Sequence, residues 1–275
     1  MKVFAIGDLH LSGNPPTKPM DIFGSHWTDH WNRIKKDWSD RVTPEDIVFI
    51  VGDISWALRL EQALADLQEI STLPGQKYMI RGNHDYWWSS VKKMNTSTTG
   101  AFTFLQGHGL ALWQNKSTLL AFGGTRGYLC PNDPNFQEDT DRTIYDRELM
   151  RTEAALKEMD DTIKKSLTHV NISAPNNENS NGASENSTTN SENTITDRDS
   201  SINVVKILLL HYPPCNELNE TSGFTELLHT YGVNHCIFGH LHDQQSFKNI
   251  PLAVANTELH LVSADYMDFK LKEIL

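Results

Sequence analysis

Cysteine is scarce in this chain of 275 residues, which contains only Cys130, Cys215 and Cys236. An odd number of cysteines without Cys-x-x-Cys spacing argues against a disulfide framework and favours a reducing compartment. Long apolar runs are also missing, since the run at 204–210 has the length of a strand and not of a membrane span. The first residues begin a strand directly and show no signal-peptide pattern. We therefore expect a cytoplasmic protein without a membrane segment.

Basic residues are fewer than acidic ones: 24 Lys and Arg against 35 Asp and Glu give a net charge of −11. This balance argues against electrostatic binding of DNA or RNA over a broad surface. It does not argue against a small anionic substrate, because two bound divalent cations would add about +4 inside the site itself.

Short apolar runs typical of buried strands recur along the chain at 3–7, 47–51, 76–80, 206–210 and 236–238. Apolar residues at helical spacing separate them, at 27–38, at 60–70 and from about 142 to 167. Segments 111–113 and 118–122 resemble a hairpin, and residues 258–271 alternate like closing strands. This order predicts α/β layering. The charged side of the helix at 142–168 is interpreted as an ordinary solvated face.

Residues 171–203 differ from the rest, because Asn, Ser, Thr and Glu dominate and large apolar residues are nearly missing. Such a segment buries too little surface to offset its ordering entropy, so we predict a disordered insertion. The strand pattern resumes at 206–210, and we therefore predict one domain over 1–275 with the insertion inside it.

Five of the apolar runs end in residues of metal-ligand type, at the strand ends where open α/β sheets bind ligands. These residues are Asp8, His10, Asp53, Asn83, His84, Asp85, His211, His240 and His242. Each short motif alone is also common in turns and caps, but their joint order makes coincidence a poor explanation. Carboxylate and imidazole groups suit Zn, Mn or Fe, and the lack of a thiol argues against a structural zinc site. Seven ligand side chains are too many for one cation and suit two divalent ions that share a bridging carboxylate.

The whole pattern, from Asp8 to His242, resembles the calcineurin-like metallophosphoesterase superfamily. The resemblance implies a four-layer α/β/β/α sandwich of two mixed sheets, with a dimetal site at one sheet edge. One ion would be held by Asp8, His10, Asp53 and His242, and the other by Asp53, Asn83, His211 and His240. His84 would protonate the leaving oxygen or stabilise the phosphoryl charge. Asp85 is expected to orient the turn.

One departure from the superfamily's motifs narrows the expected subclass of enzyme. Phosphoprotein phosphatases of this superfamily follow the bridging aspartate with an Asp-Arg-Gly turn, whereas here Ile54, Ser55 and Trp56 follow Asp53. Trp56 stands at the position that would pair with the catalytic histidine, and the phosphate-binding arginine of that turn is missing. The resemblance therefore does not extend to the phosphoprotein phosphatase branch.

The expected function is hydrolysis of a phosphomonoester or phosphodiester of a small molecule, by a hydroxide that the two cations generate. Arg126 and Tyr86 are expected to contact the substrate, with a surface salt bridge as the alternative for Arg126. Arg81 is interpreted as structural. A nuclease of the same superfamily and a non-catalytic protein-binding scaffold of the same fold remain as alternatives. The oligomeric state is left open.

Overall fold

Two mixed β-sheets lie at the centre of the computed structural model, which describes residues 1–172, 202–216, 218 and 220–275. The first sheet has the strand order β11-β1-β2-β3-β4, in which β1 to β4 are parallel and β11 is antiparallel to β1. Its strands are β1 (Val3–Ile6), β2 (Ile47–Val51), β3 (Gln76–Ile80), β4 (Phe102–Leu105) and β11 (Lys272–Glu273).

The second sheet has the order β5-β6-β7-β8-β10-β9, in which the strands from β6 to β10 are parallel and the two edges are antiparallel. Its strands are β5 (His108–Trp113), β6 (Thr118–Gly124), β7 (Asn203–Leu209), β8 (His235–Phe238), β9 (Ala253–Val254) and β10 (Thr257–Leu261). The pairing of β5 with β6 confirms the hairpin that the sequence predicts.

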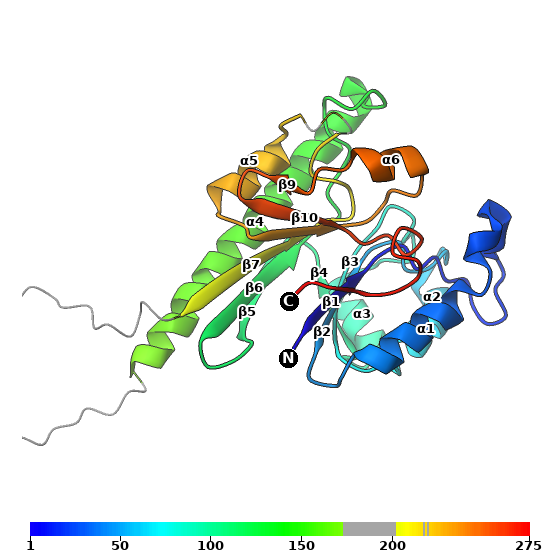
Figure 1. The fold of residues 1–275 in the computed structure, drawn as a ribbon, viewed down its shortest axis with the longest axis horizontal. Helices are drawn as coiled ribbons and strands as arrows, with labels where there is room; N and C mark the ends of the chain where they lie inside the picture. Colours follow the sequence, from blue (N-terminus) through cyan, green and yellow to red (C-terminus); the bar gives the residue numbers. More distant parts are fainter. Residues whose placement is uncertain (173–201, 217, 219) are drawn as a thin grey trace, which may run out of the picture.

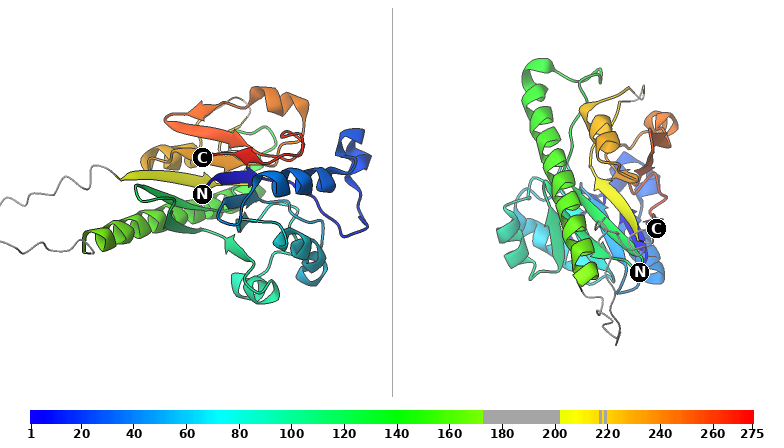
Figure 2. Two further views of the ribbon diagram at one scale, coloured as in Figure 1. Left: turned by 60° about the horizontal axis from the view of Figure 1, so that its bottom comes forward. Right: turned by 90° about the vertical axis from the view of Figure 1, so that its left-hand side faces the viewer.

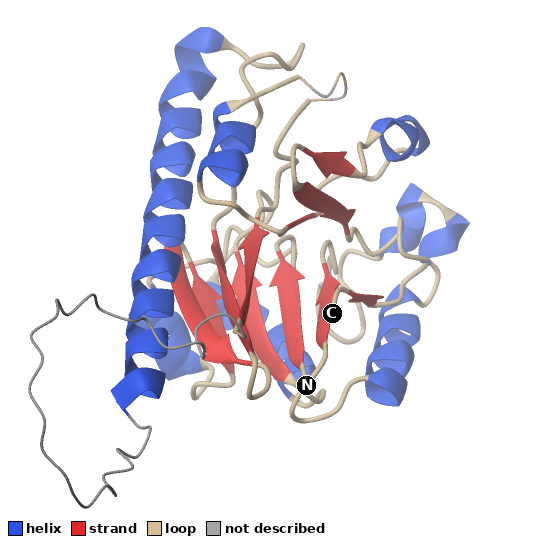
Figure 3. Ribbon diagram, turned by 60° about the vertical axis from the view of Figure 1, so that its left-hand side comes forward, coloured by secondary structure: helices blue, strands red, loops and turns tan. Residues whose placement is uncertain are grey.

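Helices cover the outer faces of both sheets (Figures 1 and 2). The first sheet packs against α1 (His30–Arg41), α2 (Leu60–Ser71) and α3 (Val91–Ser97). The second packs against α4 (Glu138–Ile172), which runs along the sheet in Figure 3, and against α5 (Gly223–Thr230). The shorter elements are α6 (Gln244–Asn249) and the 3-10 turns η1 (Met20–Phe23) and η2 (Ser25–Trp27).

Alternate residues of each strand belong to different apolar layers. Val3 and Ala5 of β1 pack between the two sheets, whereas Phe4 and Ile6 pack against the helices of the first sheet. In the second sheet, Leu208 faces α4 and α5. Because both faces of the central strands are buried, these strands are continuous apolar runs in the sequence. The predicted four-layer α/β/β/α fold is confirmed.

Several element boundaries differ from the sequence-based predictions. Trp27 lies in η2 and not on α1, because Asp29 adopts a left-handed backbone conformation (φ 54°) that separates the two. The segment at 258–271 forms one strand, β10, followed by a turn, and the closing strand β11 begins after it. Of the predicted insertion, Asn171 and Ile172 end α4 and Asn203 begins β7, and the remaining residues lie outside the described part of the chain. The single-domain assignment stays a prediction.

Membrane crossing by a helix has no support in the described residues, where none of the helices is both long and apolar enough.

The turn before β2 depends on the carboxylate of Asp46, which is 4% exposed. It accepts hydrogen bonds from the backbone nitrogens of Lys2 (2.6 Å) and Thr43 (2.9 Å) and from the Thr43 hydroxyl (2.9 Å). Burial works to raise the pKa of Asp46, but these donors outweigh burial and lower it. A carboxyl with a lowered folded-state pKa stabilises the fold above its unfolded pKa, and this contribution is lost as the pH falls through the folded pKa.

We therefore expect Asp46→Asn to reduce the free energy of unfolding by about 1–3 kcal/mol at pH 7, because an amide cannot accept all three bonds. The difference from the parent should shrink below the usual aspartate range, about pH 4. Urea denaturation at several pH values measures it, with Asp40→Asn, in an exposed pair with Lys36, as the control. Equal losses for both variants at pH 7 would contradict this account.

Candidate metal centre

The carboxyl ends of β1, β2 and β3 in one sheet and of β7 and β8 in the other lie at the same edge of the sandwich. The backbone joins the two sheets there, since the Gly7 nitrogen donates to the Val262 carbonyl (2.8 Å) and the Ala264 nitrogen donates to the Gly7 carbonyl (3.1 Å). Residues more than two hundred positions apart are thereby brought into contact. The backbone nitrogen of His240, for example, donates to the carboxylate of Asp8 (3.0 Å).

One group of donor atoms is formed by Asp8, His10 and His242. The Nε2 atom of His242 lies 3.3 Å from Nε2 of His10 and 3.4 Å from Oδ1 of Asp8. Asp8 is fully buried, whereas the side chain of His242 is 35% exposed. This group therefore opens to solvent on the side of His242.

The second group is centred on Asn83. Its Oδ1 atom lies 2.7 Å from Nε2 of His211 and 2.9 Å from Nδ1 of His240. His211 is fully buried, and its Nδ1 lies 2.9 Å from the carbonyl oxygen of Val51. A proton on Nδ1 of His211, donated to that carbonyl, would leave the Nε2 lone pair available to a cation held together with Asn83 Oδ1.

Asp53 lies between the two groups. Its Oδ2 is 3.9 Å from Nε2 of His10 and 3.6 Å from Nε2 of His211. Its Oδ1 accepts a hydrogen bond from the backbone nitrogen of His84 (2.8 Å), which holds the carboxylate in place. Metal–ligand bonds of about 2.0–2.2 Å separate neighbouring donors by roughly 3.0–3.5 Å, close to the distances within both groups. The donor set thus fits two cations that share Asp53, and the ligand roles of all seven residues stay predictions.

Several of these residues have strained backbones. Asp8, His10, Asp53 and His240 have φ values of 57°, 48°, 49° and 74°, in the left-handed region that residues other than glycine rarely adopt. Each such residue costs of order 1–3 kcal/mol and persists only where the surroundings impose it. The strain turns the side chains toward the shared edge immediately after their strands.

At two positions beside the carboxylates of the centre, only glycine fits. A Cβ atom on Gly82 would collide with the backbone and carboxylate of Asp53, and one on Gly239 would collide with the carboxylate of Asp8. These glycines let the loops of the two sheets approach the carboxylates closely.

Burial and mutual charge shape the titration of the centre. Burial raises the pKa of Asp53 to about 7, with His211 opposing the rise and Asp8 adding to it. Burial lowers the pKa values of His10 and His240 to about 3, so both imidazoles are neutral, the form in which histidine binds a metal. For His242 burial is outweighed by hydrogen bonds to Asp265 and Asp8, which raise its pKa to about 10.

The residue predicted to act on the leaving group, His84, lies beside Trp56. The two rings are 4.6 Å apart, and the indole also stacks on His10 at 4.8 Å and 21°. Trp56 therefore contacts both a predicted ligand and the predicted acid. Burial lowers the pKa of His84, and the nearby His211 lowers it further.

Asp85 accepts hydrogen bonds from the backbone nitrogens of Gly82, Ile54 and Ser55 and from the indole of Trp87. This set fits the predicted role of Asp85 in orienting the turn.

The two predicted substrate contacts lie outside the two donor groups. Tyr86 is 58% exposed, and its ring centre is 6.4 Å from that of His84. Arg126 is half-buried, and its guanidinium lies over the ring of Tyr128 at 5.3 Å. Neither residue lines the pocket described next, and both contacts stay predictions.

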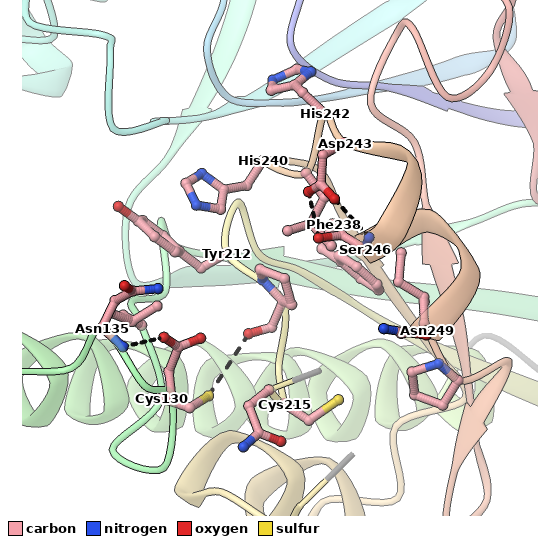
Figure 4. A pocket seen from close by; sticks show the side chains of 17 residues that line it. Cys130, Asn135, Tyr212, Cys215, Phe238, His240, His242, Asp243, Ser246 and Asn249 are labelled. Atoms are coloured by element: carbon pink, nitrogen blue, oxygen red, sulfur yellow. Dashed lines mark hydrogen bonds between the residues drawn. The ribbon is translucent and has the colours of Figure 1, made fainter. Parts of the chain in front are cut away.

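A pocket of about 420 Å³ adjoins the second donor group (Figure 4). His240, His242 and Tyr212 lie at one side of it, and Cys130 and Cys215 lie across from them. The rings of Tyr212 and His240 are 4.1 Å apart. Phe238, Leu241 and Ile250 add apolar lining, and the charged carboxylates are those of Asp133 and Asp243. No lysine or arginine is among the lining residues that the structure describes.

One residue of the centre was missed by sequence reasoning. Asp265 lies in the turn after β10, its Oδ1 is 3.0 Å from Nδ1 of His242, and its side chain is 4% exposed. A carboxylate in this position orients a metal-binding imidazole and increases its basicity. It belongs to no strand-end motif, so the sequence carries no signal for it.

A further group of ligand type, His235, Glu258 and His260, lies on the neighbouring strands β8 and β10. His235 Nδ1 and His260 Nε2 are 3.0 Å apart, as in a hydrogen bond between the two rings. Sequence reasoning assigned no role to these histidines.

The fold and these donors define a class: α/β/β/α proteins that carry carboxylate and imidazole groups at their strand ends. A family model described as calcineurin-like phosphoesterase matches residues 1–244. The chain belongs to this family, whose members use divalent metals and generally hydrolyse phosphoester bonds.

Two individual proteins show more limited similarity. The Gene 66 protein of Mycobacterium phage D29 is 35% identical over 83 residues, which are 30% of this chain and 40% of the phage protein. A crystal structure of a protein of unknown function from Aquifex aeolicus aligns with 99% of this chain and 95% of that chain, at 14% identity and a TM-score of 0.45.

We expect Asp265→Asn to weaken Mn²⁺ binding by about 10–100-fold, because the imidazole of His242 loses its anionic partner. Fold stability should change little, since the substitution conserves size. Titration with Mn²⁺ measures the affinity. Asp268→Asn, three residues later and exposed, is the matched control and should bind as the parent does. Unchanged affinity in Asp265→Asn would remove this residue from the centre.

Proposed function

We propose that this protein is a binuclear metal-dependent phosphohydrolase that cleaves a phosphomonoester or phosphodiester of a small molecule. The observation that carries the proposal is the placement of Asp53, whose Oδ2 lies within 4 Å of a donor from each group. When bound, two divalent cations, Mn, Fe or Zn, supply a nucleophile from water and neutralise charge on the phosphoryl group.

The residues of the chain would share the remaining tasks. The backbone nitrogen of His84 holds Asp53 in its shared position, while the half-buried imidazole of His84 would face a leaving oxygen. Trp56 restrains that imidazole by ring contact, where the phosphoprotein phosphatases would supply an acidic partner. The lowered pKa of His84 makes its protonated form a stronger acid, which suits donation to an alkoxide.

The pocket beside His240 supports a small-molecule substrate. Its apolar floor and its two aspartates suit a neutral or cationic organic group, while the phosphoryl group would occupy the donor side. The same acidic lining disfavours a polyanionic nucleic acid. Three buried, free cysteines support a reducing, cytoplasmic location. Neither a membrane nor a nucleic acid is among the proposed partners.

Asp53→Asn should reduce Mn²⁺-dependent hydrolysis of p-nitrophenyl phosphate and of its bis ester to background, because an amide oxygen bridges two cations poorly. Initial rates at saturating Mn²⁺ measure the effect. Asp21→Asn, an exposed aspartate in η1, is the control and should keep full activity. Full turnover by Asp53→Asn would refute the binuclear mechanism.

His84→Asn should affect poor leaving groups most. For an alkyl phosphate we expect a loss in kcat of roughly 10²–10⁴-fold, the usual contribution of a general acid, and a much smaller loss for p-nitrophenyl phosphate. The slope of log kcat against the pKa of the leaving group measures the difference. A uniform loss across all leaving groups would show that His84 stabilises charge and donates no proton. His229→Asn, on the exposed side of α5, is the control.

A further inference from the structure

Four arginines line a small crevice between α4 and the loops that follow β3 and β6. They are Arg81, Arg126, Arg147 and Arg151, and Glu148 is the one carboxylate among the lining residues that the structure describes. The crevice therefore has a net charge of +3, in a chain whose net charge is −11. Crowded like charges raise the free energy of the fold unless an anion offsets them.

Glu148 is already engaged by its neighbours. Its Oε2 accepts a hydrogen bond from the Thr125 hydroxyl (2.5 Å), and its Oε1 accepts one from Arg151 (2.6 Å) and lies 3.6 Å from Nε of Arg147. The side chain of Glu148 is only 2% exposed, whereas those of Arg147 and Arg151 are 52% and 37% exposed. The two guanidinium groups therefore present their remaining donors to solvent.

Arg81 and Arg126 are less well compensated. Nε of Arg81 donates to the backbone carbonyl of Asp85 (3.2 Å), and Arg126 lies over the ring of Tyr128. Neither guanidinium forms an ion pair with a carboxylate within the described ranges. Burial lowers the pKa of Arg81, and repulsion by Arg126 lowers it further.

The crevice shares its backbone with the metal centre. Arg81 is two residues from Asn83, and the carbonyl oxygen of Arg126 accepts hydrogen bonds from the backbone nitrogens of His211 (2.9 Å) and Tyr212 (3.0 Å). The cavity volume of about 40 Å³ accommodates roughly three waters, or one tetrahedral oxyanion of similar size.

We propose that this arginine crevice is a second anion site, which binds a phosphate-type oxyanion beside the metal centre. Guanidinium groups match the geometry of phosphate oxygens and form paired, charge-assisted hydrogen bonds with them. Two sources share this chemistry: a second phosphoryl group of the substrate, or free inorganic phosphate. The first source rests on the proposed function, whereas the second does not.

The substrate source is tested with Arg147→Gln and Arg151→Gln, which remove charge but keep an amide near Glu148. KM for adenosine 3′,5′-bisphosphate should rise about tenfold or more, in line with the loss of a charge-assisted contact. The kinetic constants for p-nitrophenyl phosphate and adenosine 5′-phosphate should stay within about twofold, since these substrates have one phosphoryl group. Arg142→Gln, on the same helix but paired with Glu138, is the matched control.

The free-anion source is tested by calorimetric titration with inorganic phosphate, which needs no turnover. The Mn²⁺-loaded parent should bind phosphate at two sites, and the double variant Arg147→Gln/Arg151→Gln at one. Loss of this site with unchanged KM values for every substrate would identify free phosphate as the ligand. Equal phosphate binding in the parent and the double variant, together with unchanged KM for the bisphosphate, would overturn the proposal. Phosphate binding without hydrolysis of any ester would instead count against the proposed function alone.

Discussion

The position of the Asp53 carboxylate is the constraint on which the centre depends. Its Oδ1 is held by the backbone nitrogen of His84, so that Oδ2 points between His10 and His211. These four residues come from loops after four different strands, and two sheets must pack in register for them to meet. Burial raises the pKa of Asp53 to about 7, because the ionised carboxylate loses its hydration there. Bound divalent cations would instead stabilise the ionised carboxylate of Asp53.

The local strain follows from the same requirement. Four residues of the centre adopt left-handed backbones, and glycines stand where the loops touch the carboxylates. The three apolar layers around the two sheets supply the packing that maintains these conformations. The packing of the apolar layers therefore offsets the backbone strain at the strand ends.

The sequence predicts much of this arrangement because the informative residues stand directly after apolar strand runs. The positions of Asp8, Asp53 and His211 could be predicted in this way. The four-layer fold could be predicted from the family resemblance. Asp265 could not, because it follows a turn with no pattern of its own and meets His242 only through the tertiary fold.

The arginine crevice could not be predicted from the sequence either. Arg147 and Arg151 are one helical turn apart on α4. The sequence pattern alone indicates an ordinary solvated helix face at these positions. Only the packing of α4 against the loops brings them to Arg81 and Arg126. Arg126 was predicted as a substrate contact and Arg81 as structural, and neither role included the other three arginines.

The most direct test of the central claim is a crystal structure of the Mn²⁺-loaded protein with anomalous diffraction data. The account predicts two anomalous peaks about 3.5–4 Å apart, on either side of Asp53 Oδ2, the spacing typical of two-metal sites. One would lie nearest Asp8, His10 and His242, and the other nearest Asn83, His211 and His240. A single peak, or two ions that do not share Asp53, would contradict the account.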